Sequence, residues 1–80
     1  MTLEYKGHRI DALASPSNNG DWGVEVTLIW TDGTVERKRK FGPYQAFFSA
    51  TDAESWGLLS GMEWIDIGKP ARLAAVTLPD

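Results

Sequence analysis

The sequence predicts an α+β domain, in which a small antiparallel sheet of four to five short strands is followed by one C-terminal helix packed on the sheet. Three observations predict this fold: residues 22–30 alternate between apolar and polar positions, an Asp-Gly pair follows them, and residues 51–67 carry a helical pattern. Strands joined by tight turns pair antiparallel, and a helix beside them must bury its apolar stripe. Eighty residues suffice for one small domain. We assign it to residues 1–70 and expect residues 71–80 to form a flexible tail.

The chain is expected to begin with two short strands, residues 2–5 and 8–14, joined by a turn at Lys6-Gly7. Gly7 can adopt the positive φ that such a turn requires. The next segment, SPSNNGD at 15–21, contains Pro, Asn and Gly and no apolar residue, which predicts a loop.

Residues 22–30 give the strongest strand signal, because large apolar residues occupy every second position. These residues are Trp22, Val24, Val26, Leu28 and Trp30. A turn at Asp32-Gly33 then predicts a hairpin with residues 35–41. This turn would place Trp30 opposite Val35 and Glu25 opposite Lys40. The basic residues at 37–40 predict an edge strand, where charge prevents aggregation.

The pair Gly42-Pro43 is expected to end this strand. Residues 44–49, YQAFFS, would then form a strand or extended segment that brings Phe47 or Phe48 into the core. Thr51 and Glu54 have the spacing of a capping box, which predicts that a helix begins there.

Small residues and one tryptophan share a stripe of this helix; they are Ala53, Gly57, Gly61 and Trp64. A stripe of small side chains would let the helix backbone approach the sheet closely. Gly68 stands where a C-terminal cap is expected, and Pro70 prevents the helix from resuming.

Composition excludes several classes of protein. The chain has no cysteine, so it has neither a disulfide nor a cysteine-based metal site. No apolar run is long enough for a membrane span, and the first residues lack the pattern of a signal peptide, so we expect a cytoplasmic protein. A net charge of −3 disfavours a general polyanion binder.

No catalytic constellation stands out, and we predict that the protein is not an enzyme. His8 is the only histidine. The acidic residues of the predicted helix lie on different sides of that helix, so they do not converge on one site. The sequence contains no glycine-rich phosphate loop, zinc-ligand spacing or nucleophile elbow. We therefore predict no catalytic residue, no metal site and no cofactor.

An apolar group on the outward side of the predicted helix is a candidate protein interface, for a partner or for self-association. It comprises Trp56, Leu59 and Ile67. Exposed aromatic and aliphatic clusters are typical of interfaces. The alternative is that the C-terminal tail covers them through Leu73, Val76 or Leu78.

The basic run is a candidate nucleic-acid contact and comprises Arg37, Lys38, Arg39 and Lys40. These cations could hold a phosphate backbone while Tyr44, Phe47 and Phe48 stack on bases. The alternative is a solvated edge strand with protective charge. Alternation along a strand also divides the run between the two faces of the sheet, which weakens any single patch.

The order of motifs resembles a loose group of small uncharacterised bacterial α+β proteins, some of them carried on prophages. The resemblance spans residues 3–69 and is carried by Tyr5-Lys6-Gly7-His8-Arg9-Ile10, a strand that begins at Trp22, Phe41, Ala53-Glu54 and Trp64-Ile65-Asp66. It implies an α+β fold and transfers no catalytic residue, ligand or cofactor. The leading hypothesis is a non-enzymatic protein-interaction or accessory module, derived from a phage or prophage. The alternative is an accessory protein that binds nucleic acid through 37–40.

Overall fold

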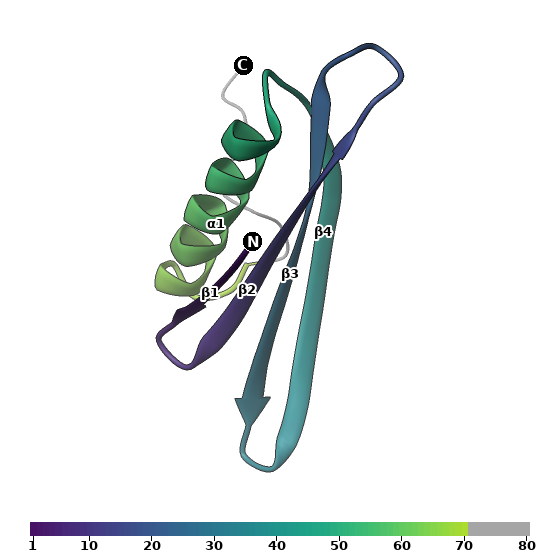
Figure 1. Ribbon diagram of the computed structural model, residues 1–80. Coiled ribbons are helices and arrows are strands. Elements are labelled where there is room, and N and C mark those ends of the chain that lie inside the picture. Colours follow the sequence, from purple (N-terminus) through teal and green to yellow (C-terminus); the bar gives the residue numbers. More distant parts are fainter. Residues whose placement is uncertain (71–80) are drawn as a thin grey trace.

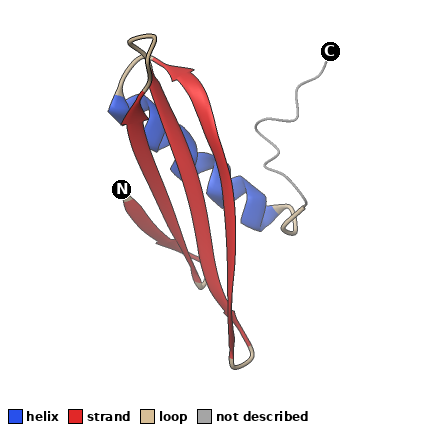
Figure 2. Ribbon diagram, turned by 90° about the vertical axis from the view of Figure 1, so that its right-hand side faces the viewer, coloured by secondary structure: helices blue, strands red, loops and turns tan. Residues whose placement is uncertain are grey.

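The computed structural model describes residues 1–70 of the chain, so the tail predicted for 71–80 lies outside the described residues. Four strands precede one helix: β1 (Thr2–Tyr5), β2 (His8–Pro16), β3 (Trp22–Asp32), β4 (Val35–Phe47) and α1 (Ala50–Asp66). The strands pair antiparallel in chain order, and α1 lies across one face of the sheet (Figures 1 and 2). The predicted α+β fold is confirmed.

The first hairpin has the predicted turn. Lys6 and Gly7 both adopt a positive φ, of 49° and 76°, which is the backbone of a type I′ turn. Leu3 lies opposite Ile10 in the resulting register. The strand β2 is longer than predicted, since it continues to Pro16.

The predicted register of the second hairpin is wrong by two residues. The loop is Gly33-Thr34, Asp32 lies opposite Val35, and Trp30 therefore lies opposite Arg37. Of the two loop residues only Gly33 takes a positive φ, of 67°, and a type II′ turn requires glycine at that first position. A shift of two residues leaves every side chain on its predicted face.

The predicted end of β4 at Gly42-Pro43 is also wrong, because the strand continues to Phe47 with an altered course. The Gly42-Pro43 peptide bond is cis, and Gly42 and Ala46 have φ values of 100° and 79°. The pairing with β3 shifts register between Val26 and Trp22. Proline is tolerated because β4 is an edge strand, where an N–H facing outward has no partner to lose.

The N-cap of the helix lies two residues before the predicted one. Ser49 is the N-cap, and its hydroxyl accepts a hydrogen bond of 3.1 Å from the backbone N–H of Asp52. Thr51 lies within the first turn of α1. Ser49 and Asp52 offer the same spacing of a hydroxyl and an acidic residue as Thr51 and Glu54, so the two possible starts resemble each other in sequence.

The helix ends at Asp66, and Gly68 takes the predicted place in its C-terminal cap, with a φ of 97°. The Gly68 N–H donates to the carbonyl of Ile65 at 3.3 Å, and the Lys69 N–H donates to the carbonyl of Trp64 at 2.9 Å. This pair of bonds is a Schellman motif. The Trp64 indole N–H also donates to the carbonyl of Pro70 at 2.8 Å, which fixes the chain after the helix.

The core lies between α1 and the centre of the sheet, and the predicted stripe of small residues faces it. Ala53, Gly57, Gly61 and Trp64 are all buried. They pack on side chains of β2, β3 and β4, so that the buried apolar core comprises Ile10, Ala12, Val24, Val26, Leu28, Phe41, Ala53 and Trp64. Within residues 1–70, no helix covers the opposite face of the sheet, which we call the helix-free face (Figure 2).

Candidate interaction surfaces

The structure divides the predicted apolar group on α1. Trp56 is half-buried, since its ring packs against Tyr44 at a centroid distance of 5.2 Å and against Phe47 at 5.4 Å. Leu59 is 65% exposed and Ile67 is 53% exposed. Trp56 is covered because β4 continues beyond Pro43 and carries two aromatic rings to the helix. Leu59 and Ile67 remain accessible among the described residues, while the covering role predicted for Leu73, Val76 or Leu78 lies outside them.

Phe48 is an exposed aromatic residue that the sequence analysis considered for base stacking or for the core, and not for the candidate protein interface. We expected Phe47 or Phe48 in the core, and Phe47 takes that place by packing against it. Phe48 is 96% exposed, immediately before the N-cap of α1. The positive φ of Ala46 alters the course of β4 here, and nothing in the local sequence pattern predicts it.

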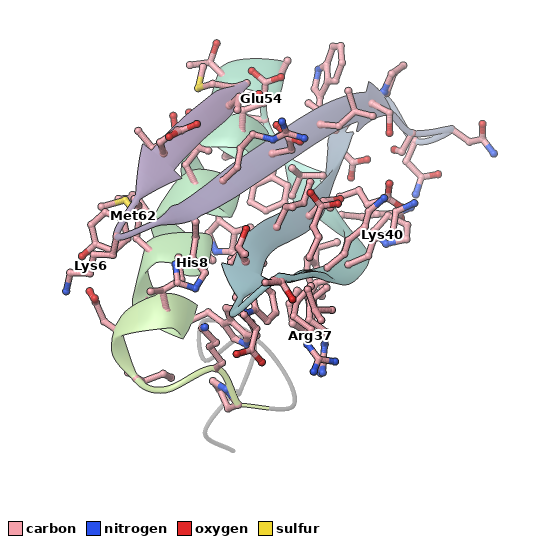
Figure 3. All side chains as sticks on the ribbon, turned by 90° about the horizontal axis from the view of Figure 1, so that it is seen from below. Lys6, His8, Arg37, Lys40, Glu54 and Met62 are labelled. Carbon is pink, nitrogen blue, oxygen red and sulfur yellow. The ribbon has the colours of Figure 1, made fainter. Side chains whose placement is uncertain are left out.

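The basic run is divided between the two faces of the sheet, as its alternation predicts. Arg37 and Arg39 lie opposite Trp30 and Leu28, whose side chains belong to the helix-covered face; Lys38 and Lys40 project from the other face. Figure 3 shows Arg37 and Lys40 on opposite sides of the β4 ribbon. The four cations therefore do not form a single patch.

Two of these cations form ion pairs at the surface. Arg37 lies 3.6 Å from the carboxylate of Asp32, and Lys40 lies 3.4 Å from that of Glu25. The second pair was predicted; it forms diagonally, because Lys40 lies opposite Thr27. Both pairs are largely exposed, and exposed ion pairs contribute little to stability.

Cationic side chains cover aromatic rings on the helix side of the sheet. The ammonium of Lys69 lies 4.5 Å from the centroid of the Trp30 ring, and the Arg39 guanidinium lies 5.7 Å from that of Phe41. Cations are attracted to such ring faces. Trp30 and Phe41 also pack against Trp64, so their faces are already occupied by side chains of the protein.

The helix-free face of the sheet forms a shallow, open depression of about 400 Å³. Its lining mixes both charges with apolar groups. Arg9 and Asp11 pair at 3.6 Å, Lys40 and Glu25 pair across the strands, and Leu13 is 64% exposed. Because cations and carboxylates alternate, this face has no strong charge of one sign.

His8 is turned into the structure and does not present a free nitrogen to a ligand. Its Nδ1 donates to the carbonyl of Lys6 at 2.7 Å, and its Nε2 is buried without a hydrogen-bond partner. The ring lies 5.5 Å from that of Trp30. The adjoining depression of about 250 Å³ also includes Glu4 and Glu36, yet no group of three metal-ligating side chains occurs within residues 1–70.

An exposed polar cluster connects the end of α1 to the first turn of the sheet. The Lys6 ammonium donates to Asp66 at 2.7 Å, and the Tyr5 hydroxyl donates to the same carboxylate at 2.9 Å. The hydrogen bonds from Lys6 and from Tyr5 lower the pKa of Asp66, and the same contact with Asp66 raises the pKa of Lys6. The cluster has a structural explanation as an anchor for the helix.

Comparisons with known proteins add no assignment. No family model, no curated protein and no solved structure matches the chain. The resemblance to small bacterial and prophage proteins therefore stays a prediction. Within the described residues, no helix has both the length and the apolar character needed to cross a membrane.

Proposed function

We propose that the protein is a non-enzymatic protein-interaction module that binds its partner at the edge strand β4. The observation that carries this proposal is the length of the exposed edge: β4 has 13 residues, and within residues 1–70 it pairs on one side only, with β3. The outer N–H and C=O groups of an edge strand can pair with another chain.

The other edge of the sheet offers much less. The strand β1 has only four residues, whereas β4 has 13 residues, most of them exposed. Short edge strands are a common protection against unwanted pairing. The asymmetry between the two edges favours β4 as the place where a further strand could add.

Exposed apolar residues near α1 provide a second contact region for such a partner. Phe48, Leu59 and Ile67 are each more than half exposed. Aromatic and aliphatic side chains contribute strongly to protein interfaces once water is excluded from them. The accessory role for a phage or prophage belongs to this proposal and is supported only by the sequence resemblance.

Selection of linear peptides from a random library, with the folded protein as the target, tests the proposal. We expect a consensus to be enriched, and light scattering of the free protein will show whether it also self-associates. The variant Leu59→Ser distinguishes binding at the edge of β4 from binding at the apolar residues near α1. Peptides that pair with β4 should still bind this variant. A protein that remains strictly monomeric and enriches no peptide would contradict the proposal.

A second candidate function is the binding of single-stranded nucleic acid on the helix side of the sheet. It is favoured by one observation: Arg37, Arg39 and Lys69 gather on that side, around Trp30 and Phe41. Gel-shift titrations at increasing salt test it. Arg37→Gln should weaken such binding and Lys38→Gln, on the other face, should not; the absence of a shift at low salt removes this candidate.

A further inference from the structure

We propose that the edge of β4 at residues 35–41 binds an acidic segment in extended conformation, which joins the sheet as a fifth strand. This inference depends on the proposed interaction function and names the chemical class of its partner. It follows from the regularity of this part of β4, from the distribution of its charges and from the space around it.

The first half of β4 is regular and the second half is not. Pairs with β3 follow one another without interruption from Asp32 opposite Val35 to Val26 opposite Phe41. Beyond Phe41 the register shifts, and Pro43 has no N–H to donate. Bulges and proline protect an edge against pairing. An added strand can therefore extend along residues 35–41 but not along the remainder of β4.

Charge alone protects this regular half, and protection by charge is selective. Two copies of residues 37–40 paired antiparallel would bring cations opposite cations, which is unfavourable. The same cations attract a carboxylate-rich strand. The pairs that Arg37 and Lys40 form with Asp32 and Glu25 are exposed, so they can be exchanged for carboxylates of a partner.

The division of the basic run between two faces favours a strand over any ligand that lies on one face. A nucleic-acid backbone on one side would meet either Arg37 and Arg39 or Lys38 and Lys40. An added strand projects successive side chains to alternate faces. Carboxylates at consecutive positions would then approach the arginines on one face and the lysines on the other.

The edge is also open on both sides at this point. The helix covers the middle of the sheet, and the end of the β3–β4 hairpin projects beyond it (Figures 1 and 2). Arg37 and Lys40 extend to different sides of the ribbon (Figure 3). The side chains of residues 35–40 are exposed, whereas Phe41 at the end of this stretch is buried against Trp64 of α1. Side chains of an added strand would therefore find room on both faces along residues 35–40.

Titration of the whole protein with an end-capped peptide of sequence TVEEEEVT tests the inference, by fluorescence anisotropy at low salt. Two further peptides carry N-methyl groups on alternate amides, one on the odd and one on the even positions. Only one set of amides in an added strand faces β4. We expect one methylated peptide to bind like the parent and the other to lose roughly tenfold or more in affinity.

Variants of the protein test both faces at once. Arg37→Gln and Lys38→Gln should each weaken binding of the acidic peptide. Arg9→Gln removes the same charge from the helix-free face but lies on β2, two strands from the edge, and should leave binding unchanged. Circular dichroism of each variant verifies that the fold is retained.

Four results would overturn the inference. The two methylated peptides could bind equally, which would show charge attraction without strand addition. The peptide TVKKKKVT could bind as well as the acidic one. A thymidine oligonucleotide could bind while the acidic peptide does not, which would favour nucleic acid. The acidic peptide could fail to bind although the library selection yields a consensus; in that case the interaction function would stand and this inference would fall.

Discussion

Gly61 of α1 lies so close to Ile10 of β2 that a Cβ atom added to the glycine would be 2.7 Å from Ile10 Cγ2. Gly57 has a similar relationship with Ala12, at 2.9 Å between the added Cβ and the alanine Cβ. Each glycine costs about 1 kcal/mol relative to alanine in a helix interior. The close approach of helix and sheet, and the dispersion contacts it allows, offset that cost.

Gly61→Ala should destabilise the protein, although alanine favours the helix. The added methyl group must displace the branched side chain of Ile10, and overpacking of this kind typically costs about 1–3 kcal/mol. Chemical denaturation monitored by circular dichroism measures the change. Ser55→Ala, on the exposed side of α1, serves as the control. An increase in stability for Gly61→Ala would show that the helix can move away from β2 without loss.

Ser49→Ala should lower the free energy of unfolding by about 1 kcal/mol, because it removes the side-chain acceptor for the Asp52 N–H. Thr51→Ala should change it by no more than about 0.5 kcal/mol, since Thr51 is an exposed residue within the first turn. Thermal or chemical unfolding of the two variants decides between the two possible starts of the helix. Equal losses, or a larger loss for Thr51→Ala, would contradict the observed cap.

Trp56→Ala should destabilise the fold by about 2–3 kcal/mol, because the Trp56 ring packs against Tyr44 and Phe47. The loss should be smaller than for a fully buried tryptophan, since Trp56 is only half-buried. Leu59→Ala, three residues along the helix, should remain within about 0.5 kcal/mol of the parent protein. Urea unfolding measures both. If the two variants were equally stable, Trp56 would be a surface residue, as its position on the helical wheel suggested.

Asp66→Asn should reduce stability near neutral pH and not at low pH. The pKa of Asp66 is lower in the folded protein than its ordinary value of 3.8. Its carboxylate therefore stabilises the fold above that value, and this contribution disappears as pH falls through the folded pKa. For Lys6 the pKa is raised above 10.5, so its contribution is present below that value and disappears as pH rises through the folded pKa. The melting temperatures of the parent protein and of Asp66→Asn should differ most between the ordinary pKa of Asp66, 3.8, and that of Lys6, 10.5. The difference should be small, because both groups are exposed. A constant difference at all pH values would contradict this explanation.

Much of the fold could be predicted because it follows from local patterns. Alternation in residues 22–30 identified the inner face of β3, and the small residues of α1 identified the face that meets the sheet. The register of the second hairpin could not be predicted as easily, because both Asp32-Gly33 and Gly33-Thr34 place glycine in a tight turn. The same ambiguity applied to Ser49 and Thr51 as caps.

The candidate surfaces depended on long-range structure. Trp56 is covered, and Phe48 exposed, only because β4 continues past Pro43 with a changed course. Neither residue carries a local signal for this outcome. Lys69 was also missed, since its position over Trp30 requires the Schellman turn to direct the chain back toward the sheet. Alternation along 37–40, in contrast, predicted correctly that the basic run would be split.

The pairing of the strands in chain order has a consequence for how the protein reaches its native state. Each hairpin can close over a short loop, so the sheet can assemble through successive local steps. The glycine-lined face of α1, however, has no surface to dock on until β2 and β3 are joined. We therefore expect helix docking to follow the rate-limiting step, so that Gly61→Ala accelerates unfolding and leaves the refolding rate nearly unchanged.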